Sequence, residues 1–599
     1  MNHATHRNAD HPPGWAAALL LFAFSLALYT LNDSWAYTHN LVDEWVMTGN
    51  ILDWHDYARE FPFNYRGARV SWLAPAWPFL HFLPAFWANL SLRALLLAGG
   101  AAPVLLTLRR LGASLAGATL GALLLISNPY FLQAAGWNYV NGPGLDYVAW
   151  SLFFLSAAAR ARKRSWWLLA AGAAMLSAVW CYLMVAFLGG AFAVFYLVQR
   201  GWPRLAEATR EIAWLIAGGE AITIVLGLIN MAMGGPFLFF VPQFGEALRI
   251  AEEPSLSAPL ALWLSNASWL IVPGLGVVAG VLLALPSTGR RWGLDRRVVA
   301  TGLALIVAAV SLGLLDVTNT RVALEYNAGI HAVYLLPFAI LPLALLIDHH
   351  LTGRTTFWQA GAVLAVAAVL LVFYYAPLAI YLRKVKIPWV RPSSSLLGNE
   401  HVFIVFAFVV GVLVIALIAS VSRPNAISLT ALALGLSYLN VVTAPGTNWI
   451  FPAQAQSRDR FLLTLDALAA LSSLNQDHQL YLWFRNDDRH NNIAGDYLDV
   501  AGPFFWRERV SNRYPSFIYD PTPHKAWQRR DILPALKPGS RLALLGDPSE
   551  LPTAASTMAG RGLTLHIVQQ RILREGQAAV PLTILVVAPA NSKPGAAAH

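Results

Sequence analysis

The sequence predicts a polytopic α-helical membrane protein of about 13 spans, followed by a soluble α/β domain. Three observations predict this fold class. Of the 599 residues, 57% are hydrophobic and 12% are charged, whereas soluble domains average about 25% charged residues. Apolar runs recur from residue 15 to residue 443, and arginine-rich turns separate many of them. Beyond residue 444 charged residues become common and short strand-like runs follow.

The charge and cysteine content exclude several classes of protein. The formal net charge is +10, but the cations stand in short turns between apolar runs. This placement is the positive-inside pattern that orients membrane helices, so no nucleic-acid partner is expected. The single cysteine, Cys181, excludes an internal disulfide and a cysteine-rich metal site.

The spans are placed by the rule that a membrane helix needs about 20 mainly apolar residues. Residues 1–14 are predicted to be a cytoplasmic tail, and the first span lacks a small-residue cleavage site and is therefore expected to be retained. The long run 166–199 is divided at Trp180-Cys181-Tyr182, and segment 73–87, with three prolines, is expected to be a broken helix. The predicted spans lie near 15–31, 88–108, 113–128, 144–160, 166–181, 183–199, 211–230, 259–285, 299–315, 330–348, 357–377, 401–421 and 427–443.

The turn charges predict the topology. With residues 1–14 inside, the turns rich in arginine and lysine fall on the cytoplasmic side. The outer segments are then 32–72, 129–143, 231–258, 316–329 and 378–399. Segment 378–399 is an exception because it holds four cations, Arg383, Lys384, Lys386 and Arg391. Either a span is miscounted or these cations bind an anion, and the regular alternation of the other turns favours the second interpretation.

The C-terminal part, residues 444–599, is expected to form an α/β domain outside the cytoplasm, because an odd number of spans precedes it. An amphipathic stretch follows residue 448, and strand-like runs occur at 480–484, 542–545, 563–568 and 582–587. The order of helix, turn, strand and loop is typical of an α/β domain.

The outer loop 32–72 carries the first candidate for chemistry, the acidic pair Asp43 and Glu44. Apolar residues at helical spacing around the pair predict a helix at the membrane interface. Adjacent residues on a helix point about 100° apart, so one of the two carboxylates would enter a given cavity. There it could act as a general base toward an acceptor hydroxyl. The alternative is a solvated acid at the start of a helix.

Two arginines follow in the same loop, Arg66 and Arg69. A guanidinium group makes planar, bidentate contacts with phosphate, so the pair could hold a phosphate and stabilise its charge as it leaves. The alternative is that the arginines anchor the loop to lipid headgroups.

Further polar residues stand at the outer ends of spans. Asn141 and Asp146 precede or enter the span 144–160, and a charged residue at that depth is expensive and often functional. Arg321 could bind a lipid phosphate or pair with Glu325 at helical spacing, and Tyr326 lies beside them.

Familiar catalytic motifs are absent. The sequence has no HExxH, CxxC, Walker or GxSxG pattern, so no motif indicates a zinc protease, a redox enzyme, an ATPase or a serine hydrolase. No cofactor is predicted; Asp43 or Glu44 could contact a divalent metal, but no ligand cluster accompanies them.

The layout resembles a known family. An acidic pair after the first span, the stretch Tyr65-Arg66-Gly67-x-Arg69 and a proline-interrupted segment resemble the bacterial relatives of dolichyl-phosphate-mannose protein mannosyltransferases. These proteins and the lipid A aminoarabinose transferase are GT-C membrane glycosyltransferases. The resemblance covers residues 15–443, and the stretches 138–143 and 325–337 also look like this group. No Lys-Pro-Pro follows the loop here, so neither the sugar nor the acceptor is implied.

The resemblance implies an enzyme of the GT-C type. It would be an inverting glycosyltransferase that moves a sugar from a polyprenyl-phosphate donor to a lipid, glycan or protein acceptor. It would lie in the bacterial inner membrane, in contact with membrane lipid, and act at the outer face. Asp43 matches the family's catalytic acid, with Glu44 beside it; Arg66, Arg69 and Arg321 would bind the donor phosphate. The remaining candidates would line the substrate pocket: Tyr65, Asn141, Asp146, Glu325 and Tyr326.

Two other functions are weighed against this one. A transporter or flippase of lipid-linked sugars predicts charged residues within spans and symmetric halves. A non-catalytic component of polysaccharide assembly, organised by the C-terminal domain, predicts that replacing Asp43 affects no sugar transfer.

Overall fold

The computed structural model describes sixteen stretches of the chain, namely residues 21–23, 25–26, 42–52, 54–60, 62, 65–136, 139–252, 271–284, 296–318, 332–352, 457–474, 480–483, 516–517, 536–546, 549–576 and 578–590. The spans predicted at 357–377, 401–421 and 427–443 lie outside these residues. The tail 1–14 and the four cations of segment 378–399 also lie outside them.

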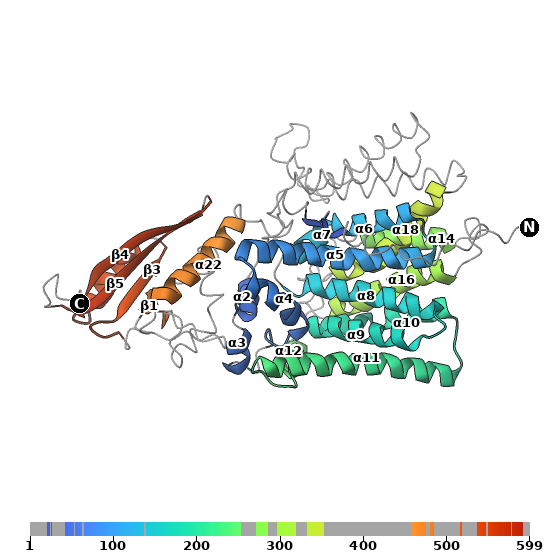
Figure 1. Ribbon diagram of the computed structural model, residues 1–599, viewed down its shortest axis with the longest axis horizontal. Coiled ribbons are helices and arrows are strands. Elements are labelled where there is room, and N and C mark those ends of the chain that lie inside the picture. Colours follow the sequence, from blue (N-terminus) through green and yellow to red (C-terminus); the bar gives the residue numbers. More distant parts are fainter. Residues whose placement is uncertain are drawn as a thin grey trace, which may run out of the picture.

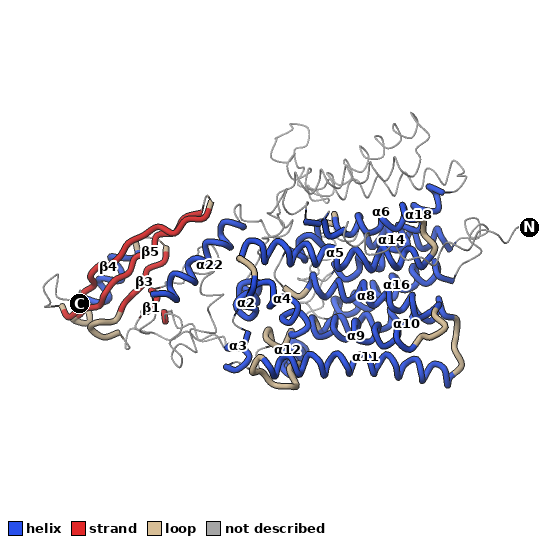
Figure 2. The backbone as a smooth tube through the Cα atoms, in the orientation of Figure 1, coloured by secondary structure: helices blue, strands red, loops and turns tan. Residues whose placement is uncertain are grey.

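A bundle of long helices makes up most of the described chain (Figures 1 and 2). Each of these helices overlaps a predicted span, because apolar runs of this length satisfy their backbone hydrogen bonds most readily as helices. They are α5 (Ala85–Leu111), α6 (Leu115–Ile126), α8 (Asn141–Arg160), α9 (Ser165–Cys181), α10 (Gly189–Arg200) with the 3-10 turn η2 (Leu183–Leu188) before it, α11 (Leu205–Ala232), α14 (Ile271–Ala284), α16 (Arg296–Thr318) and α18 (Leu336–Thr352) after the 3-10 turn η4 (Ala332–Leu335).

By length and composition, four helices of the described chain could cross a membrane, or up to five if one bent pair forms a single span. The bent pair is α6 with α7 (Pro129–Gly136). Three shorter apolar helices accompany them, from α9, α14 and η4–α18. The chain therefore has the helices of a polytopic membrane protein.

Two predicted breaks are observed at neighbouring residues. The run 166–199 divides at Tyr182, whose extended backbone (φ −151°, ψ 112°) ends α9. The proline-rich segment 73–87 is likewise divided between α5, which begins at Ala85, and α4 (Val70–Phe82), which has two prolines inside it. Helix α4 ends at Leu83, which precedes Pro84 and has β-region dihedrals, as expected for a residue before proline.

The helices α9 and α11 pack with their backbones close together. A Cβ atom on Gly172 would collide with the backbone carbonyl of Leu215, and one on Gly218 would collide with that of Leu169. Small residues permit such close approach between membrane helices.

Arginines gather at one end of the bundle, where α5, α8 and α10 end and α9, α11 and α16 begin. There Glu211 forms ion pairs with Arg164 (3.1 Å) and Arg200 (3.2 Å). The carboxylate therefore connects the start of α9, the end of α10 and the first turns of α11.

Short helices lie at the opposite end, between the bundle and the C-terminal sheet (Figure 1). They include α2 (Val42–Leu52), α3 (Trp54–Glu60), α4 and α12 (Val241–Glu252). Helix α2 buries Met47 and Ile51 completely, one turn apart, and packs on α4. The sequence around Asp43 therefore forms a helix, as expected.

The C-terminal part contains a five-stranded mixed sheet in the order β2-β1-β3-β5-β4. Strand β1 is parallel to β2 and β3, whereas β5 is antiparallel to β3 and β4. The strands are β1 (Leu480–Trp483), β2 (Ser516–Phe517), β3 (Arg541–Leu545), β4 (Leu563–Glu575) and β5 (Ala578–Pro589). Each of the four predicted strand runs overlaps one of them.

The two faces of the sheet are covered by different helices. Alternation along β3 sends Ala543 and Leu545 to one face and Leu542 and Leu544 to the other. Helix α22 (Ser457–Leu474) covers the first face, and α24 (Glu550–Ala559) covers the second.

Helix α22 also joins the sheet to the bundle. Its Phe461 belongs to the hydrophobic core of the bundle, whereas its Leu463 belongs to the core of the sheet. Tyr57 of α3 is 2% exposed and is buried in that same sheet core. The loop 32–72 and the sheet are therefore on the same side of the bundle.

Candidate functional site

The acidic pair lies in the first turn of α2, with Asp43 and Glu44 as its second and third residues. The acids stand near the N-terminal end of the helix, where negative charge is stabilised by the helix dipole. Helix α2, which carries Asp43, packs on α4, which begins directly after Arg69. The side chains of both acids lie outside the described part of the structure.

The two arginines precede α4 and lie among tyrosine rings. The guanidinium carbon of Arg69 is 4.4 Å from the ring centroid of Tyr139, 5.5 Å from that of Tyr182 and 5.3 Å from that of Tyr65. Arg66 shares the Tyr65 ring at 4.9 Å. Arg69 is only 4% exposed. Cation–π contacts of this kind orient a guanidinium group and stabilise it where water is scarce.

Three parts of the chain supply these rings. Tyr65 belongs to the stretch before α4, Tyr139 lies just before α8, and Tyr182 is the residue at which α9 ends. The tyrosines meet because the start of α8 and the end of α9 both lie against α4.

Helix α12 holds the arginine stretch in place. The Gln243 side-chain amide donates to the carbonyl of Ala68 (2.9 Å) and to that of Trp180 (3.0 Å). Within the stretch, the Arg69 amide donates to the carbonyl of Arg66 at 3.3 Å, which closes a turn between the two arginines. The position of Arg69 is therefore tied to the end of α9.

Two hydrogen bonds near Arg69 link α4 to the neighbouring helices. The Ser71 hydroxyl donates to the Cys181 sulfur at 3.1 Å, and the Tyr147 hydroxyl donates to the Ser71 carbonyl at 2.9 Å. These bonds connect α4 with α9 and α8. Cys181 is close enough to Arg69 and to Asp146 to interact electrostatically with both.

Asn141 and Asp146 both lie on α8 and are buried, at 1% and 9% exposure. The Asp146 carboxylate lies against α5, where a Cβ atom on Gly99 or Gly100 would come within 2.7 Å of one of its oxygens. Among the described residues, its Oδ1 atom has no hydrogen-bond partner. A carboxylate buried in an apolar helix is costly, and such residues usually serve a function.

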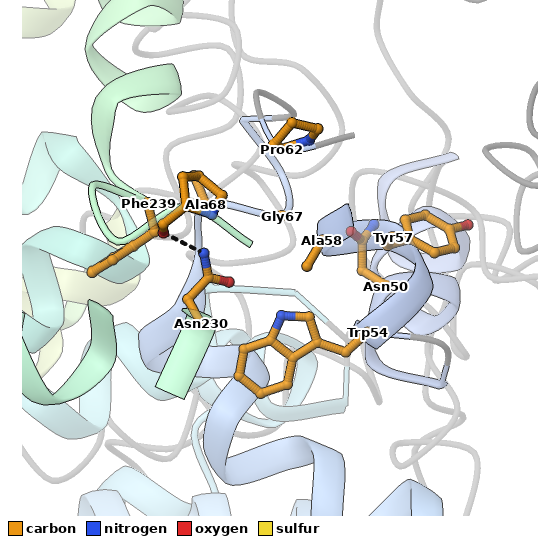
Figure 3. A pocket seen from close by; sticks show the side chains of 10 residues that line it. Asn50, Trp54, Tyr57, Ala58, Pro62, Gly67, Ala68, Asn230 and Phe239 are labelled. Atoms are coloured by element: carbon orange, nitrogen blue, oxygen red, sulfur yellow. Dashed lines mark hydrogen bonds between the residues drawn. The ribbon is translucent and has the colours of Figure 1, made fainter. Parts of the chain in front are cut away.

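A small hollow lies beside the arginine stretch (Figure 3). Trp54 of α3 lines it and is 3% exposed, and Asn230 at the end of α11 faces it from the opposite wall. The full lining consists of Asn50, Trp54, Tyr57, Ala58, Pro62, Gly67, Ala68, Asn230, Pro236 and Phe239. Gly67 and Ala68 stand between the two arginines, so the hollow adjoins them.

The structure brings together part of the predicted site. Tyr65, Arg66 and Arg69 form one cluster, and α8 places Asn141 and Asp146 nearby. The other predicted members, Arg321, Glu325 and Tyr326, lie outside the described residues. In the described part of the chain, no group of three or more His, Cys, Asp or Glu side chains could hold a metal ion.

Sequence reasoning missed Tyr182, Trp54 and Asn230 as members of this site. A signal existed for Tyr182, since the residues around it divide one apolar run into two spans and therefore lie where one span ends and the next begins. Nothing in the local pattern indicated Trp54 or Asn230, because α3 and the end of α11 come together only around the hollow that both residues line.

Two solved structures have a fold similar to that of this chain. ArnT from Cupriavidus metallidurans bound to undecaprenyl phosphate matches with a TM-score of 0.54 and 15% identity, over 95% of this chain and 98% of that chain. The apo state of the same protein matches with a TM-score of 0.53 and 14% identity, over the same shares. The likeness extends over nearly the whole of both chains and shows a shared fold.

A weaker match is the archaeal oligosaccharyltransferase AglB from Archaeoglobus fulgidus, solved with an inhibitory peptide and a dolichol-phosphate. It has a TM-score of 0.36 and 13% identity, over 83% of this chain and 64% of that chain. This TM-score is too low to support an argument. No protein-family model and no curated protein matches the sequence.

Proposed function

We propose that this chain, which has the fold of the GT-C membrane glycosyltransferases, is itself an inverting glycosyltransferase. It transfers a sugar from a polyprenyl-phosphate donor to a glycan, lipid or protein acceptor at the outer face of the cytoplasmic membrane. One observation carries the proposal. In a fold shared with a protein solved with undecaprenyl phosphate, Arg69 is buried over three tyrosine rings beside a second arginine.

The arginines account for the donor phosphate. Arg66 and Arg69 can each present a planar fork of N–H donors to phosphate oxygens. The tyrosine rings hold Arg69 in place before the lipid binds, so little rotamer freedom is lost on binding. Arg321 is proposed as a third cation at the same phosphate.

Asp43 is proposed as the general base, with Glu44 beside it as the alternative acid. The base takes the proton from the acceptor hydroxyl as that oxygen attacks the anomeric carbon. The bond between this carbon and the phosphate oxygen breaks, and the polyprenyl phosphate leaves with the bonding electron pair. The arginines stabilise the charge that develops on the leaving phosphate. A single displacement of this kind inverts the anomeric configuration.

Polar groups along the site would orient the sugar and the acceptor. Asn141 and Asp146 from α8, and Tyr65 from the arginine stretch, are proposed for this role, together with Glu325 and Tyr326. The C-terminal sheet is proposed to lie outside the cytoplasm, because it shares a side of the bundle with the loop 32–72. The arginine-rich end of the bundle would then face the cytoplasm, as the positive-inside rule expects.

A direct test uses the purified full-length protein in lipid vesicles. Undecaprenyl phosphates that carry one radiolabelled sugar are supplied with an extract of envelope glycans and lipids as acceptors. The expected products are labelled acceptor and free undecaprenyl phosphate in equal amounts. A protein that binds undecaprenyl phosphate but never breaks the sugar–phosphate bond would contradict the proposed reaction.

Two buried charges favour a second candidate function, a flippase of lipid-linked sugars. Arg93 on α5 is 1% exposed and donates to the Asn89 side chain at 3.1 Å, and Asp146 is buried on α8. Charged residues within spans are what a transporter requires. The same vesicles separate the two functions, since a flippase moves the labelled donor across the bilayer and leaves it intact.

A further inference from the structure

The hollow beside the arginine stretch contains a buried donor that meets no acceptor. The indole Nε1–H of Trp54 has no hydrogen-bond partner in the part of the chain that the structure describes, and the ring is 3% exposed. Figure 3 shows this nitrogen directed into the hollow. A buried donor without a partner is costly, so its position requires an explanation.

An acceptor faces the same space from the other wall. The side-chain amide nitrogen of Asn230 donates to the carbonyl of Pro236 at 2.8 Å. Because a carbonyl only accepts, this bond determines which end of the amide is the nitrogen. The amide oxygen is consequently the end that points toward the hollow (Figure 3).

The remaining lining determines the kind of ligand. Its ten residues include no charged side chain, which excludes the phosphate itself as the occupant. The Trp54 ring forms one wall of the hollow and is its aromatic surface, whereas the Tyr57 and Phe239 rings are directed away from it (Figure 3). A group that accepts from an indole and donates to an amide oxygen is a hydroxyl.

The hollow is small, so it suits one hydroxyl or hydroxymethyl edge of a sugar rather than a whole ring. Its position fits the same ligand, since Gly67 and Ala68 line it and stand directly between Arg66 and Arg69. In a sugar phosphate the ring is joined to the phosphorus through a single oxygen, so a phosphate held by these arginines keeps its sugar within reach.

We infer that the hollow between Trp54 and Asn230 recognises a hydroxyl group of the sugar carried by the lipid donor. The inference rests on the proposed function and deepens it, because it assigns the phosphate and the sugar of one donor to separate groups of residues. Trp54 and Asn230 then contribute to the choice of sugar, whereas the arginines bind any polyprenyl phosphate.

The test measures the affinity of two kinds of lipid for full-length protein in nanodiscs. One is undecaprenyl phosphate alone, and the other is a panel of undecaprenyl phosphates that carry a hexose, a pentose or an N-acetylhexosamine. The variant Trp54→Phe keeps the aromatic surface and removes the donor. Trp72→Phe is a matched control, because Trp72 is 1% exposed and its Nε1 also lacks a partner among the described residues, but it does not line the hollow.

We expect Trp54→Phe to weaken binding of at least one sugar-bearing lipid by about fivefold to tenfold, the usual effect of one lost neutral hydrogen bond. Its affinity for undecaprenyl phosphate should stay unchanged, and Trp72→Phe should change neither affinity. Ala58→Leu, which fills the hollow from α3, should likewise weaken only the sugar-bearing lipid.

Contrary outcomes are distinguishable. If the protein binds undecaprenyl phosphate but Trp54→Phe and Ala58→Leu bind every sugar-bearing lipid as the unaltered protein does, the hollow holds only a water molecule and the inference is wrong. Failure of the unaltered protein to bind any of these lipids would overturn the proposed function together with the inference.

Discussion

Tyr57 of the loop 32–72 and Leu463 of α22 lie in one buried hydrophobic cluster, at 2% and 0% exposure. The Tyr57 ring thereby joins the loop to the face of the C-terminal sheet that α22 covers. Tyr57 also lines the hollow beside the arginines. The C-terminal part of the chain is therefore in direct contact with a wall of the candidate site.

The first prediction concerns this contact. Tyr57→Ala should lower the free energy of unfolding by about 3–5 kcal/mol, the usual cost of truncating a large buried aromatic side chain. Thermal unfolding of the detergent-solubilised full-length protein measures the effect. Tyr57→Phe keeps the ring and should remain close to the unaltered protein. Equal melting temperatures for all three proteins would show that Tyr57 contributes nothing to the junction.

The second prediction addresses the proposed base. Asp43→Asn should reduce sugar transfer at least about 100-fold, because an amide cannot accept the proton and a positioned base contributes at least that much. Binding of undecaprenyl phosphate should be unchanged. Glu44→Gln is the comparison, since adjacent residues on a helix point about 100° apart and only one of the two would face a given cavity. Full transfer activity in Asp43→Asn, with loss in Glu44→Gln, would reassign the role to Glu44.

The third prediction tests the phosphate contact. Arg69→Lys should weaken binding of undecaprenyl phosphate about tenfold, because lysine lacks the planar fork and stacks less well on Tyr139. Arg110→Lys is the matched control. Arg110 also lies over aromatic rings, Phe153 at 5.4 Å and Trp167 at 5.3 Å, but at the opposite end of the bundle. Equal losses in both variants would indicate a general effect of the substitution.

The fourth prediction concerns the packing of α9 on α11. Gly172→Ala should destabilise the protein by about 1–3 kcal/mol, because the added methyl group collides with the carbonyl of Leu215 and overpacking has a cost of that size. Gly274→Ala on α14 is the control, since a Cβ atom there meets nothing within 4 Å. Thermal unfolding in detergent should separate the two variants. A melting temperature for Gly172→Ala that equals that of Gly274→Ala would mean that the helices can move apart without cost.

Much of the architecture could be predicted because it depends on local properties of the chain. The length of the apolar runs predicted the helices, and the break near Tyr182 followed from the need to fit two spans into one run. Segment 73–87 is broken as predicted, but only at Leu83 and Pro84, because Pro75 and Pro78 lie within α4.

The candidate site was only partly predictable. Arg66 and Arg69 were identified from their residue type and their place beside a span, and the resemblance to GT-C proteins agrees with the fold of ArnT. The rings that surround Arg69 could not be assigned, because tyrosines at the ends of spans are common and most of them face the membrane interface. Trp54 and Asn230 gave no signal, since each has an ordinary place in its own helix.

The sequence by itself determined the long helices of the described bundle, four of the five described strands, and which end of the bundle carries the arginines, because hydrophobicity and turn charge act locally. Only the tertiary structure decided that Arg69 meets Tyr139 and Tyr182, that Trp54 faces Asn230, and that Tyr57 is buried against the C-terminal sheet. These contacts join segments far apart in the chain. They depend on how closely the helices approach, which side-chain packing across the interfaces determines and no single segment encodes.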